Sequence, residues 1–201
     1  IDCEYEMVKI ESSEIESVID KIKSKRISGI NVTLPFKQKI IPHLNKIVNC
    51  AKETNSVNTV YLDSENKVVG DNTDVFGFQA GYLKNISNKQ NPNQSALVMG
   101  AGGVSPSIIL ALIKSNISNI TVTNRTFEKA LFLKKKFPHI KVIKWGDHIT
   151  KFNNFDIVVN ATNLGLKGGE EFKNLFNDVK DNLIYIDTIY NPLQTKMIKH
   201  L

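Results

Sequence analysis

The chain has 201 residues, of which 41% are hydrophobic and 23% charged, values typical of a soluble globular protein. Its apolar runs are too short to span a bilayer, and its first residues do not resemble a signal peptide. The net charge of +6 could attract nucleic acid, an anionic substrate or a phosphate-rich cofactor, but no nucleic-acid-binding motif is present.

The first third of the chain predicts a small α/β arrangement. Apolar residues alternate at the start of the chain, as in a strand, and then recur on one helical face from Ile15 to Ile22. The predicted elements are a strand over residues 1–10, a helix over 14–25, a strand over 28–32, helical turns up to 48, and a hairpin of 56–62 and 67–71 around the turn 63–66. The first three would form a β-α-β unit that lacks phosphate-binding glycines.

A helix from Val75 to about Ile86 follows the hairpin. The next stretch, residues 87–95, is polar and contains Pro92, a composition typical of a linker. We therefore predict two domains, one over residues 1–86 and one over residues 95–201.

A glycine-rich turn opens the second predicted domain. A short apolar strand, residues 96–99, leads into Gly100-Ala101-Gly102-Gly103-Val104-Ser105, and helical apolar spacing and a second strand, residues 120–123, come next. Gly100 permits a tight turn, and Gly102 lets backbone amides approach a pyrophosphate at the helix N-terminus. Ser105 takes the place of the usual Gly or Ala and is small enough to pack. Pro106 lies in the first helical turn, where its missing N–H costs least.

The end of the second strand indicates which dinucleotide binds. NAD-binding proteins usually carry Asp or Glu at this point, but here Asn124-Arg125-Thr126 follows and the first carboxylate is Glu128. Arg125 can bind a 2′-phosphate through two hydrogen bonds, with the hydroxyl and amide of its neighbours beside it. The alternative is an ordinary strand end with Thr126 as a helix N-cap. Thr126 can contact the cofactor and cap the helix at the same time. The segment therefore favours NADP over NAD.

The rest of the chain continues to alternate between helix and strand, which predicts a Rossmann-like doubly wound parallel sheet. The elements are a helix over 126–137 and strands over 140–143, 156–160 and 183–187. Ligands bind beyond the carboxyl ends of such strands, so Thr162 and Thr188 are expected near the nicotinamide. The lysines at 134–136 are interpreted as a solvated helix end, and Trp145 as a packing residue.

With these motifs assembled, the chain resembles the shikimate dehydrogenase family, NADP-dependent enzymes of aromatic amino-acid biosynthesis. The matching segments, in family order and spacing, are Asn31-Val32-Thr33-Leu34-Pro35-Phe36-Lys37, Ser56-Val57-Asn58-Thr59, Gly70-Asp71-Asn72-Thr73-Asp74, Gly100 to Val104, Asn124-Arg125-Thr126, Asn160-Ala161-Thr162 and Asp187-Thr188-Ile189-Tyr190-Asn191-Pro192. The resemblance implies a smaller α/β substrate-binding catalytic domain and an NADP-binding Rossmann domain. It also implies reduction of 3-dehydroshikimate to shikimate with NADPH.

The resemblance assigns catalysis to Lys37 and Asp74 as an acid–base pair, and substrate contacts to Thr33, Asn58 and Tyr190. Ketone reduction by hydride places negative charge on oxygen, so a positioned proton donor is needed, and a lysine oriented by a carboxylate can serve. Both residues also have a simpler interpretation: Lys37 as a surface lysine at the start of a helix, and Asp74 as a helix N-cap. The neighbouring motifs favour the catalytic interpretation. The predicted cofactor-binding residues are Gly100, Ala101, Gly102, Gly103, Val104, Asn124, Arg125, Thr126, Thr162 and Thr188.

The chain also departs from the family pattern. Asn163, Leu166 and Thr188 replace a serine, a methionine and an apolar residue, and the family has further chain before Ile1 and after Leu201, so the fold is expected to be incomplete at both ends. Two alternatives stay open: a quinate/shikimate dehydrogenase with another cofactor preference, and a non-catalytic nucleotide-binding relative.

The remaining expectations concern the setting of the protein. Its two cysteines, Cys3 and Cys50, have no metal-binding or redox spacing, which favours a cytoplasmic location and no bound metal. The expected partner is a small-molecule substrate, with no nucleic acid and no membrane, and the protein is expected to be a monomer or homodimer.

Overall fold

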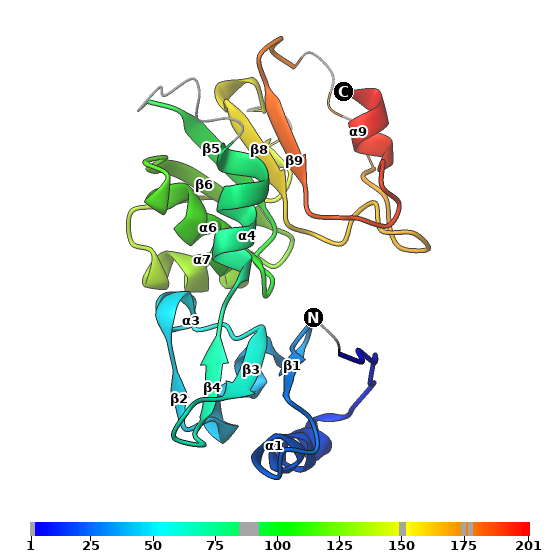
Figure 1. Cartoon of the computed structure of the whole chain (residues 1–201). Helices are drawn as coiled ribbons and strands as arrows, with labels where there is room; N and C mark the ends of the chain where they lie inside the picture. Colours follow the sequence, from blue (N-terminus) through cyan, green and yellow to red (C-terminus); the bar gives the residue numbers. More distant parts are fainter. Residues whose placement is uncertain (1–2, 85–92, 149–151, 174–175, 177–178) are drawn as a thin grey trace. The chain divides into compact units, whose positions relative to one another are not determined.

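The computed structural model describes residues 3–84, 93–148, 152–173, 176 and 179–201. The chain divides into two compact units, Ile1–Thr73 and Asp74–Leu201 (Figure 1). The helix that the sequence predicts from Val75 onward belongs to the second unit. Residues 87–92 of the predicted linker, 87–95, lie outside the described residues, and Ser95 already begins β5.

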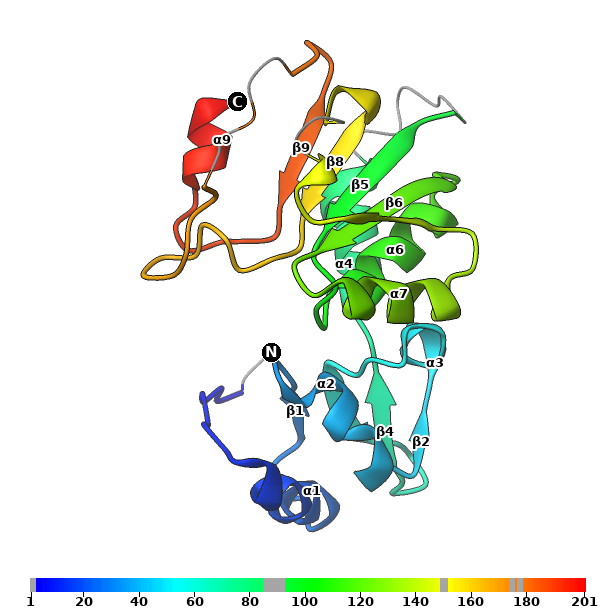
Figure 2. The same ribbon diagram turned by 180° about the vertical axis from the view of Figure 1, so that it is seen from behind.

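The first unit is built around a small mixed sheet with the strand order β1-β3-β4-β2, labelled in Figure 1 and seen from behind in Figure 2. Strand β3 is antiparallel to β1 and β4, whereas β2 is parallel to β4. Its elements are η1 (Ser12–Glu14), α1 (Ile15–Lys23), β1 (Gly29–Asn31), α2 (Phe36–Lys39), η2 (Ile41–His43), β2 (Lys46–Ile47), α3 (Asn49–Thr54), β3 (Thr59–Leu62) and β4 (Val68–Asp71).

The predicted strand over residues 1–10 is wrong for the residues described. Residues 3–10 have no regular secondary structure and are almost entirely exposed, with Met7 98% accessible. An alternating segment becomes a strand only when its backbone groups find a partner, and within the described chain residues 3–10 join no sheet. The predicted β-α-β unit is therefore also wrong, because β1 pairs with β3 in antiparallel fashion instead.

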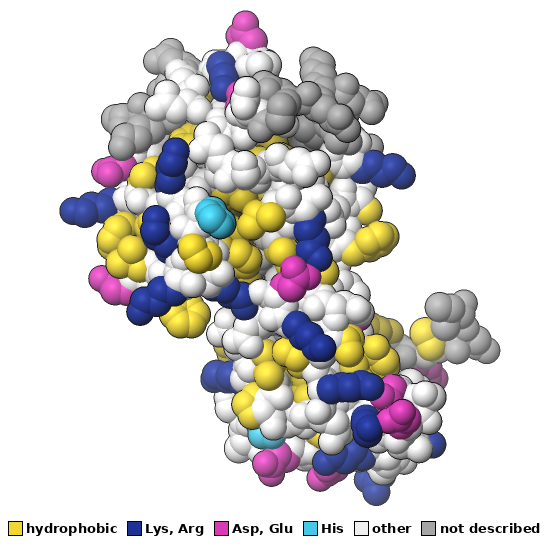
Figure 3. Space-filling view, turned by 90° about the vertical axis from the view of Figure 1, so that its left-hand side faces the viewer, with side chains coloured by type: hydrophobic (Ala, Val, Ile, Leu, Met, Phe, Trp, Pro, Cys, Tyr) yellow, Lys and Arg dark blue, Asp and Glu magenta, His cyan; other side chains and the backbone are white. Residues whose placement is uncertain are grey.

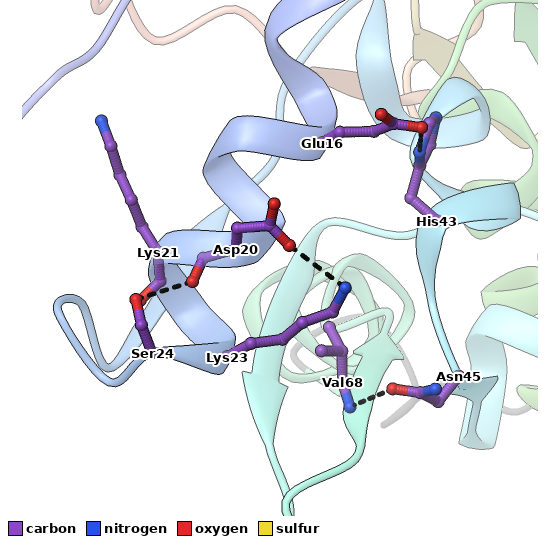
Figure 4. A network of polar contacts seen from close by, with 8 residues as sticks. All are labelled: Glu16, Asp20, Lys21, Lys23, Ser24, His43, Asn45 and Val68. Atoms are coloured by element: carbon purple, nitrogen blue, oxygen red, sulfur yellow. Dashed lines mark hydrogen bonds and ion pairs between the residues drawn. The ribbon is translucent and has the colours of Figure 1, made fainter.

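Helix α1 covers the sheet of the first unit with one apolar face. Ile15, Ile19 and Ile22 are buried at helical spacing and belong to one cluster with Val60 and Val68 of the hairpin. The opposite face is polar, as Figure 4 shows: Lys23 Nζ lies 3.2 Å from the Asp20 carboxylate, and the Ser24 hydroxyl donates to the Asp20 carbonyl where the helix ends.

The turn of the β3–β4 hairpin is held by Asp63. Its carboxylate accepts hydrogen bonds from the amides of Glu65 and Lys67 and forms an ion pair with Lys46 at 2.6 Å. The hydrogen bond from the Lys46 side chain, reinforced by that from the Lys67 amide, lowers the pKa of Asp63 from 3.8 to about 2.

The pKa of Asp63 is lower in the folded state than in the unfolded chain. Asp63 therefore stabilises the fold above pH 3.8, and this stabilisation is lost as the pH falls through about 2. We expect Asp63→Asn to lower the melting temperature near neutral pH, and this difference from the wild type to shrink toward zero at the acidic end. Thermal unfolding over a pH series measures it. The control is Glu65→Gln, which removes only an exposed ion pair with Lys67 and should change little. A lower melting temperature of Asp63→Asn that stays the same at every pH would contradict the stabilising role of the Asp63 carboxylate.

The second unit is a parallel sheet with the strand order β7-β6-β5-β8-β9. Its elements are α4 (Asp74–Phe78), the π-helical turn η3 (Gln79–Leu83), β5 (Ser95–Met99), α6 (Ser105–Lys114), β6 (Asn119–Asn124), α7 (Phe127–Lys136), β7 (Lys141–Lys144), η4 (Phe152–Asn154), β8 (Ile157–Asn160), β9 (Ile184–Asp187) and α9 (Lys196–His200). Renumbered along this unit, the order is 3-2-1-4-5, that of the Rossmann fold. The predicted parallel sheet is confirmed.

Apolar packing covers both faces of this sheet. Strands β5 and β8 are buried along their whole length, and α6 and α7 pack on the sheet beside α4 (Figure 1). On the other face, the stacked rings of Phe152 and Phe176, 3.8 Å apart, pack with Met197 of α9. Trp145 packs against this cluster and contacts the ring of His148, so its prediction as a packing residue is confirmed.

Two surface properties bear on the partners expected from the sequence. Among the described residues, no helix has both the length and the apolar character that a membrane crossing requires. On the face drawn in Figure 3, Lys and Arg side chains are mixed with Asp and Glu, and several of them lie close together in the lower part of the view. The lysines at 134–136 lie in the last turn of α7, as predicted.

Candidate active site

Three polar segments of the first unit converge at the ends of its strands. The amide of Val32 donates to the carbonyl of Asn58 at 2.7 Å, and the amide of Asn58 donates to the carbonyl of Asp71 at 3.0 Å. The carbonyl of Lys37, at the start of α2, accepts from the amide of Val57 at 2.8 Å. These backbone bonds bring Thr33, Lys37, Asn58 and Thr73 to one edge of the unit, which we call the Asn58 edge.

The side chain of Asn58 is held in one orientation at this edge. Its Oδ1 accepts from the amide of Thr73 at 3.0 Å and from the hydroxyl of Thr59 at 2.9 Å, and its Nδ2 donates to the hydroxyl of Thr73 at 3.0 Å. Lys37 and Asn58 are half-buried, whereas Thr33 is exposed. The structure therefore brings three of the predicted substrate and catalytic residues together within one unit.

Two further predicted site residues, Asp74 and Tyr190, belong to the second unit. Asp74 is the first residue of α4 and follows Thr73 of the Asn58 edge directly. Tyr190 lies in the loop after β9, where its side chain is 84% exposed. An aromatic side chain this exposed is not needed for the packing of its own unit, so it is available to a ligand.

The glycine-rich turn after β5 has the tight geometry that the sequence predicts. Gly100 has φ +113°, and a Cβ added there would lie 2.6 Å from the carbonyl oxygen of Ala161, so only glycine fits. At Gly102 an added Cβ would meet nothing within 4 Å, which leaves open space beside the backbone. This turn leads into α6, whose N-terminus can receive a phosphate group.

Two side chains brace this turn through its amides. The amide of Ala101 donates to Oδ1 of Asn124 at 3.0 Å, and the amide of Gly102 donates to the hydroxyl of Ser105 at 3.1 Å. Ser105 is fully buried, so its small side chain fits the sixth position of the motif as predicted. A pyrophosphate that uses the Ala101 or Gly102 amide would compete with Asn124 or Ser105 for it.

Arg125 follows β6 at the carboxyl edge of the sheet. Its side chain is 55% exposed, and its Nη1 lies 2.5 Å from Oε2 of Glu170, in the loop after β8. Thr126 occupies the N-cap position of α7, but its side chain makes no capping hydrogen bond. A guanidinium beside an open glycine turn fits the 2′-phosphate end of NADP.

Asn160, the last residue of β8, organises the opposite side of the same edge. Its Oδ1 accepts from the amide and hydroxyl of Thr162, and its Nδ2 donates to the carbonyl of Leu164 and to Oδ1 of Asp187. Its backbone carbonyl accepts from the amide and hydroxyl of Thr188. Thr162 and Thr188, both predicted near the nicotinamide, are thus positioned by one fully buried residue, Thr162 through its amide side chain and Thr188 through its backbone carbonyl.

Asp187 completes this buried network at the end of β9. Its carboxylate accepts from Asn160 at 3.0 Å, from the Ile189 amide at 3.0 Å and from the Thr195 hydroxyl at 2.9 Å. Burial raises the pKa of Asp187 above 3.8, and these hydrogen bonds oppose that rise. Asn160 and Asp187 belong to the motifs that carry the family resemblance, but no role was predicted for them, although polar residues that end buried strands are a sign of a structural or functional role.

The comparisons with known proteins agree with this geometry. A family model described as "Shikimate dehydrogenase substrate binding domain" matches residues 1–60, and one described as "Shikimate / quinate 5-dehydrogenase" matches residues 83–192. Shikimate dehydrogenase (NADP(+)) of Pelagibacter ubique is 42% identical over 200 residues, which are 100% of this chain and 73% of that protein.

Solved structures give the same result. The crystal structure of shikimate dehydrogenase from Aquifex aeolicus superposes with a TM-score of 0.80 at 35% identity, covering 94% of this chain and 68% of that one. Shikimate 5-dehydrogenase from Thermus thermophilus, in complex with NADP(H) and shikimate, has a TM-score of 0.75 at 26% identity, covering 94% of this chain and 69% of that one.

The strand order and the glycine turn define the second unit as a dinucleotide-binding domain of the Rossmann type. The family models cover most of the chain, and the Pelagibacter relative matches it from end to end. The chain belongs to the shikimate dehydrogenase family.

Proposed function

We propose that this protein is an NADP-dependent shikimate dehydrogenase, which interconverts 3-dehydroshikimate and shikimate by hydride transfer. The observation that carries the proposal is the match of the whole chain to an NADP-dependent shikimate dehydrogenase at 42% identity. Arg125, which follows β6 where an NAD-binding protein would carry a carboxylate, supports NADP as the cofactor.

In this proposal the first unit binds the substrate and the second binds the cofactor. Thr33 and Asn58 of the Asn58 edge, with Tyr190 after β9, offer neutral hydrogen bonds to a polyhydroxylated ring. The rigid orientation of Asn58, fixed by Thr59 and Thr73, supports a role in positioning the substrate. The glycine turn, Asn124, Arg125, Thr126, Thr162 and Thr188 would hold NADP.

The proposed chemistry is one hydride and one proton. The nicotinamide supplies the hydride when NADPH is bound. As the carbonyl carbon of 3-dehydroshikimate accepts it, the carbonyl oxygen takes a proton from Lys37 Nζ and becomes a hydroxyl, and in the oxidation Lys37 takes that proton back. Asp74 would orient Lys37 and accept a hydrogen bond from a substrate hydroxyl.

We further propose a cytoplasmic monomer or homodimer that binds neither nucleic acid nor membranes.

The role of Arg125 can be tested by binding alone. Arg125→Ala should weaken NADP binding about tenfold or more and leave NAD binding nearly unchanged, because only NADP carries the 2′-phosphate. Isothermal titration with each cofactor measures both dissociation constants. Lys129→Ala, which removes a positive charge in the first turn of α7, serves as the control and should leave both nearly unchanged. Equal losses for the two cofactors would contradict the assignment of Arg125.

A further inference from the structure

The ion pair between Arg125 and Glu170 joins two segments that are far apart in the sequence. Arg125 follows β6 and Glu170 lies in the loop after β8, while β5 runs between these two strands in the sheet. The glycine-rich turn leaves the sheet at the end of β5. Glu170 therefore reaches Arg125 from the far side of the strand whose turn would hold the pyrophosphate.

The loop that carries Glu170 has a defined conformation. The carbonyl of Glu170 accepts from the amide of Gly165 at 2.8 Å, and the amide of Gly169 donates to the carbonyl of Leu166 at 2.8 Å. The amide of Lys167 donates to the carbonyl of Asn191 at 3.0 Å, which ties the loop to the segment after β9. Since the backbone at Glu170 is held in this way, its carboxylate meets Arg125 without first having to order a free loop.

We propose that Glu170 sets the cofactor preference by competing with the 2′-phosphate of NADP for Arg125. This inference rests on the proposed function, because it concerns the same cofactor site. A guanidinium paired with a carboxylate cannot offer the same donors to a phosphate, and the carboxylate repels a phosphate brought near it. NADP must therefore displace Glu170 before it gains Arg125, whereas NAD, which has no 2′-phosphate, need not.

The opposite role would be that Glu170 orients Arg125 for the phosphate, and the two roles predict changes of opposite sign. If Glu170 competes, its removal tightens NADP binding, because Arg125 no longer exchanges one anion for another. If Glu170 orients, its removal weakens NADP binding. Both side chains are more than half exposed, so the exchange is screened and the effect is moderate.

The variant Glu170→Gln keeps the shape of the side chain and removes its charge. We expect it to bind NADP about three- to fivefold more tightly than the wild type, with NAD binding unchanged within about twofold. The matched control is Glu171→Gln, which removes the same charge from the next residue. Glu171 faces Lys196 at 3.7 Å instead of Arg125, so this variant should leave both dissociation constants unchanged.

Isothermal titration with NADP and NAD on the intact protein provides the readout. In an Arg125→Ala background, the selective effect of Glu170→Gln on NADP should be smaller, because the group for which the carboxylate competes is gone and only its repulsion of the phosphate remains. Unchanged or weaker NADP binding by Glu170→Gln, or equal tightening of NADP and NAD, would overturn the inference. Such a result would leave the proposed function intact as long as the wild type binds NADP through Arg125. A wild type that binds neither cofactor would overturn both.

Discussion

Replacing Lys37 with alanine is expected to lower kcat by about 10²–10⁴-fold while changing the KM for the substrate far less. The reason is that Lys37 is proposed to move a proton in the transition state, and a contact made mainly there contributes to the rate more than to ground-state binding. The backbone of Lys37 is fixed to Val57, so the loss of the side chain should not rearrange the Asn58 edge. Steady-state kinetics that separate kcat from KM measure the effect.

Lys39→Ala is the matched control for this variant. Lys39 lies in the same helix and carries the same charge, but its Nζ donates to the hydroxyl of Ser12, so kcat should stay near that of the wild type. If Lys37 only attracted an anionic ligand, Lys37→Ala would mainly raise KM, and added salt would shrink the difference from the wild type. An unchanged kcat in Lys37→Ala would end the proposal of proton transfer.

Asp74→Asn should raise KM and lower kcat together, because Asp74 is proposed both to orient Lys37 and to contact a substrate hydroxyl. The double variant with Lys37→Ala should be little worse than the worse single variant, since residues that act as a unit are not additive. Kinetics of the two single variants and the double variant complete this cycle. Full additivity of the two effects would indicate that Lys37 and Asp74 act independently.

The largest effect on stability is expected from Asn160→Asp. This change replaces the amide that donates to Asp187 at 3.0 Å with a carboxylate of the same shape, and sets two buried acids against each other. A broken buried polar pair costs roughly 3–5 kcal/mol, so the melting temperature should fall by roughly 10 °C. Thermal unfolding compared with the wild type measures the loss.

The pH dependence identifies the cause of that loss. Burial already raises the pKa of Asp187 in the folded wild type, and a second carboxylate would raise the pKa of the pair further. A raised folded pKa gives stability that is complete at acidic pH and is lost as pH rises through that pKa, so Asn160→Asp should be closer to the wild type at about pH 5 than at about pH 8.

Two further variants serve as controls for Asn160→Asp. Asn160→Ala loses the hydrogen bonds without adding a charge, and should be destabilised without this additional dependence on pH. The exchange variant, with Asn160→Asp and Asp187→Asn together, restores a donor–acceptor pair and should recover part of the stability. The proposed hydrogen-bond network of Asn160 and Asp187 would be contradicted if Asn160→Asp lowered the melting temperature equally at both pH values and the exchange variant recovered no stability.

The hydrophobic pattern predicted the fold of the second unit well, for physical reasons. Its strands are apolar because they are buried on both faces, and Gly100 marks a turn that no other residue can take, so both features are visible locally. Residues 3–10 show where the pattern fails. They alternate as a strand does, but whether a strand forms depends on a partner edge, which no local pattern encodes.

Some features of the candidate site could likewise be predicted from the sequence, and others could not. The family resemblance, carried by short contiguous motifs, implied that Lys37 and Asn58 share a site, and backbone hydrogen bonds bring their two segments together in the first unit. The pairing of Arg125 with Glu170 could not be predicted, since 45 residues separate them and both side chains suit any exposed surface. The support that Asn160 gives to Thr162 and Thr188 depends on the pairing of β8 with β9, which the sequence left open.

The central claim is tested most directly by assaying the intact protein with shikimate and quinate, each with NADP and with NAD. We expect NADPH to form with shikimate at the highest kcat/KM of the four combinations, and Lys37→Ala to lose this activity. Quinate with NAD as the best pair would contradict the proposed substrate and cofactor. Tight NADP binding without oxidation of either substrate would contradict catalysis itself and identify the protein as a nucleotide-binding member of its family.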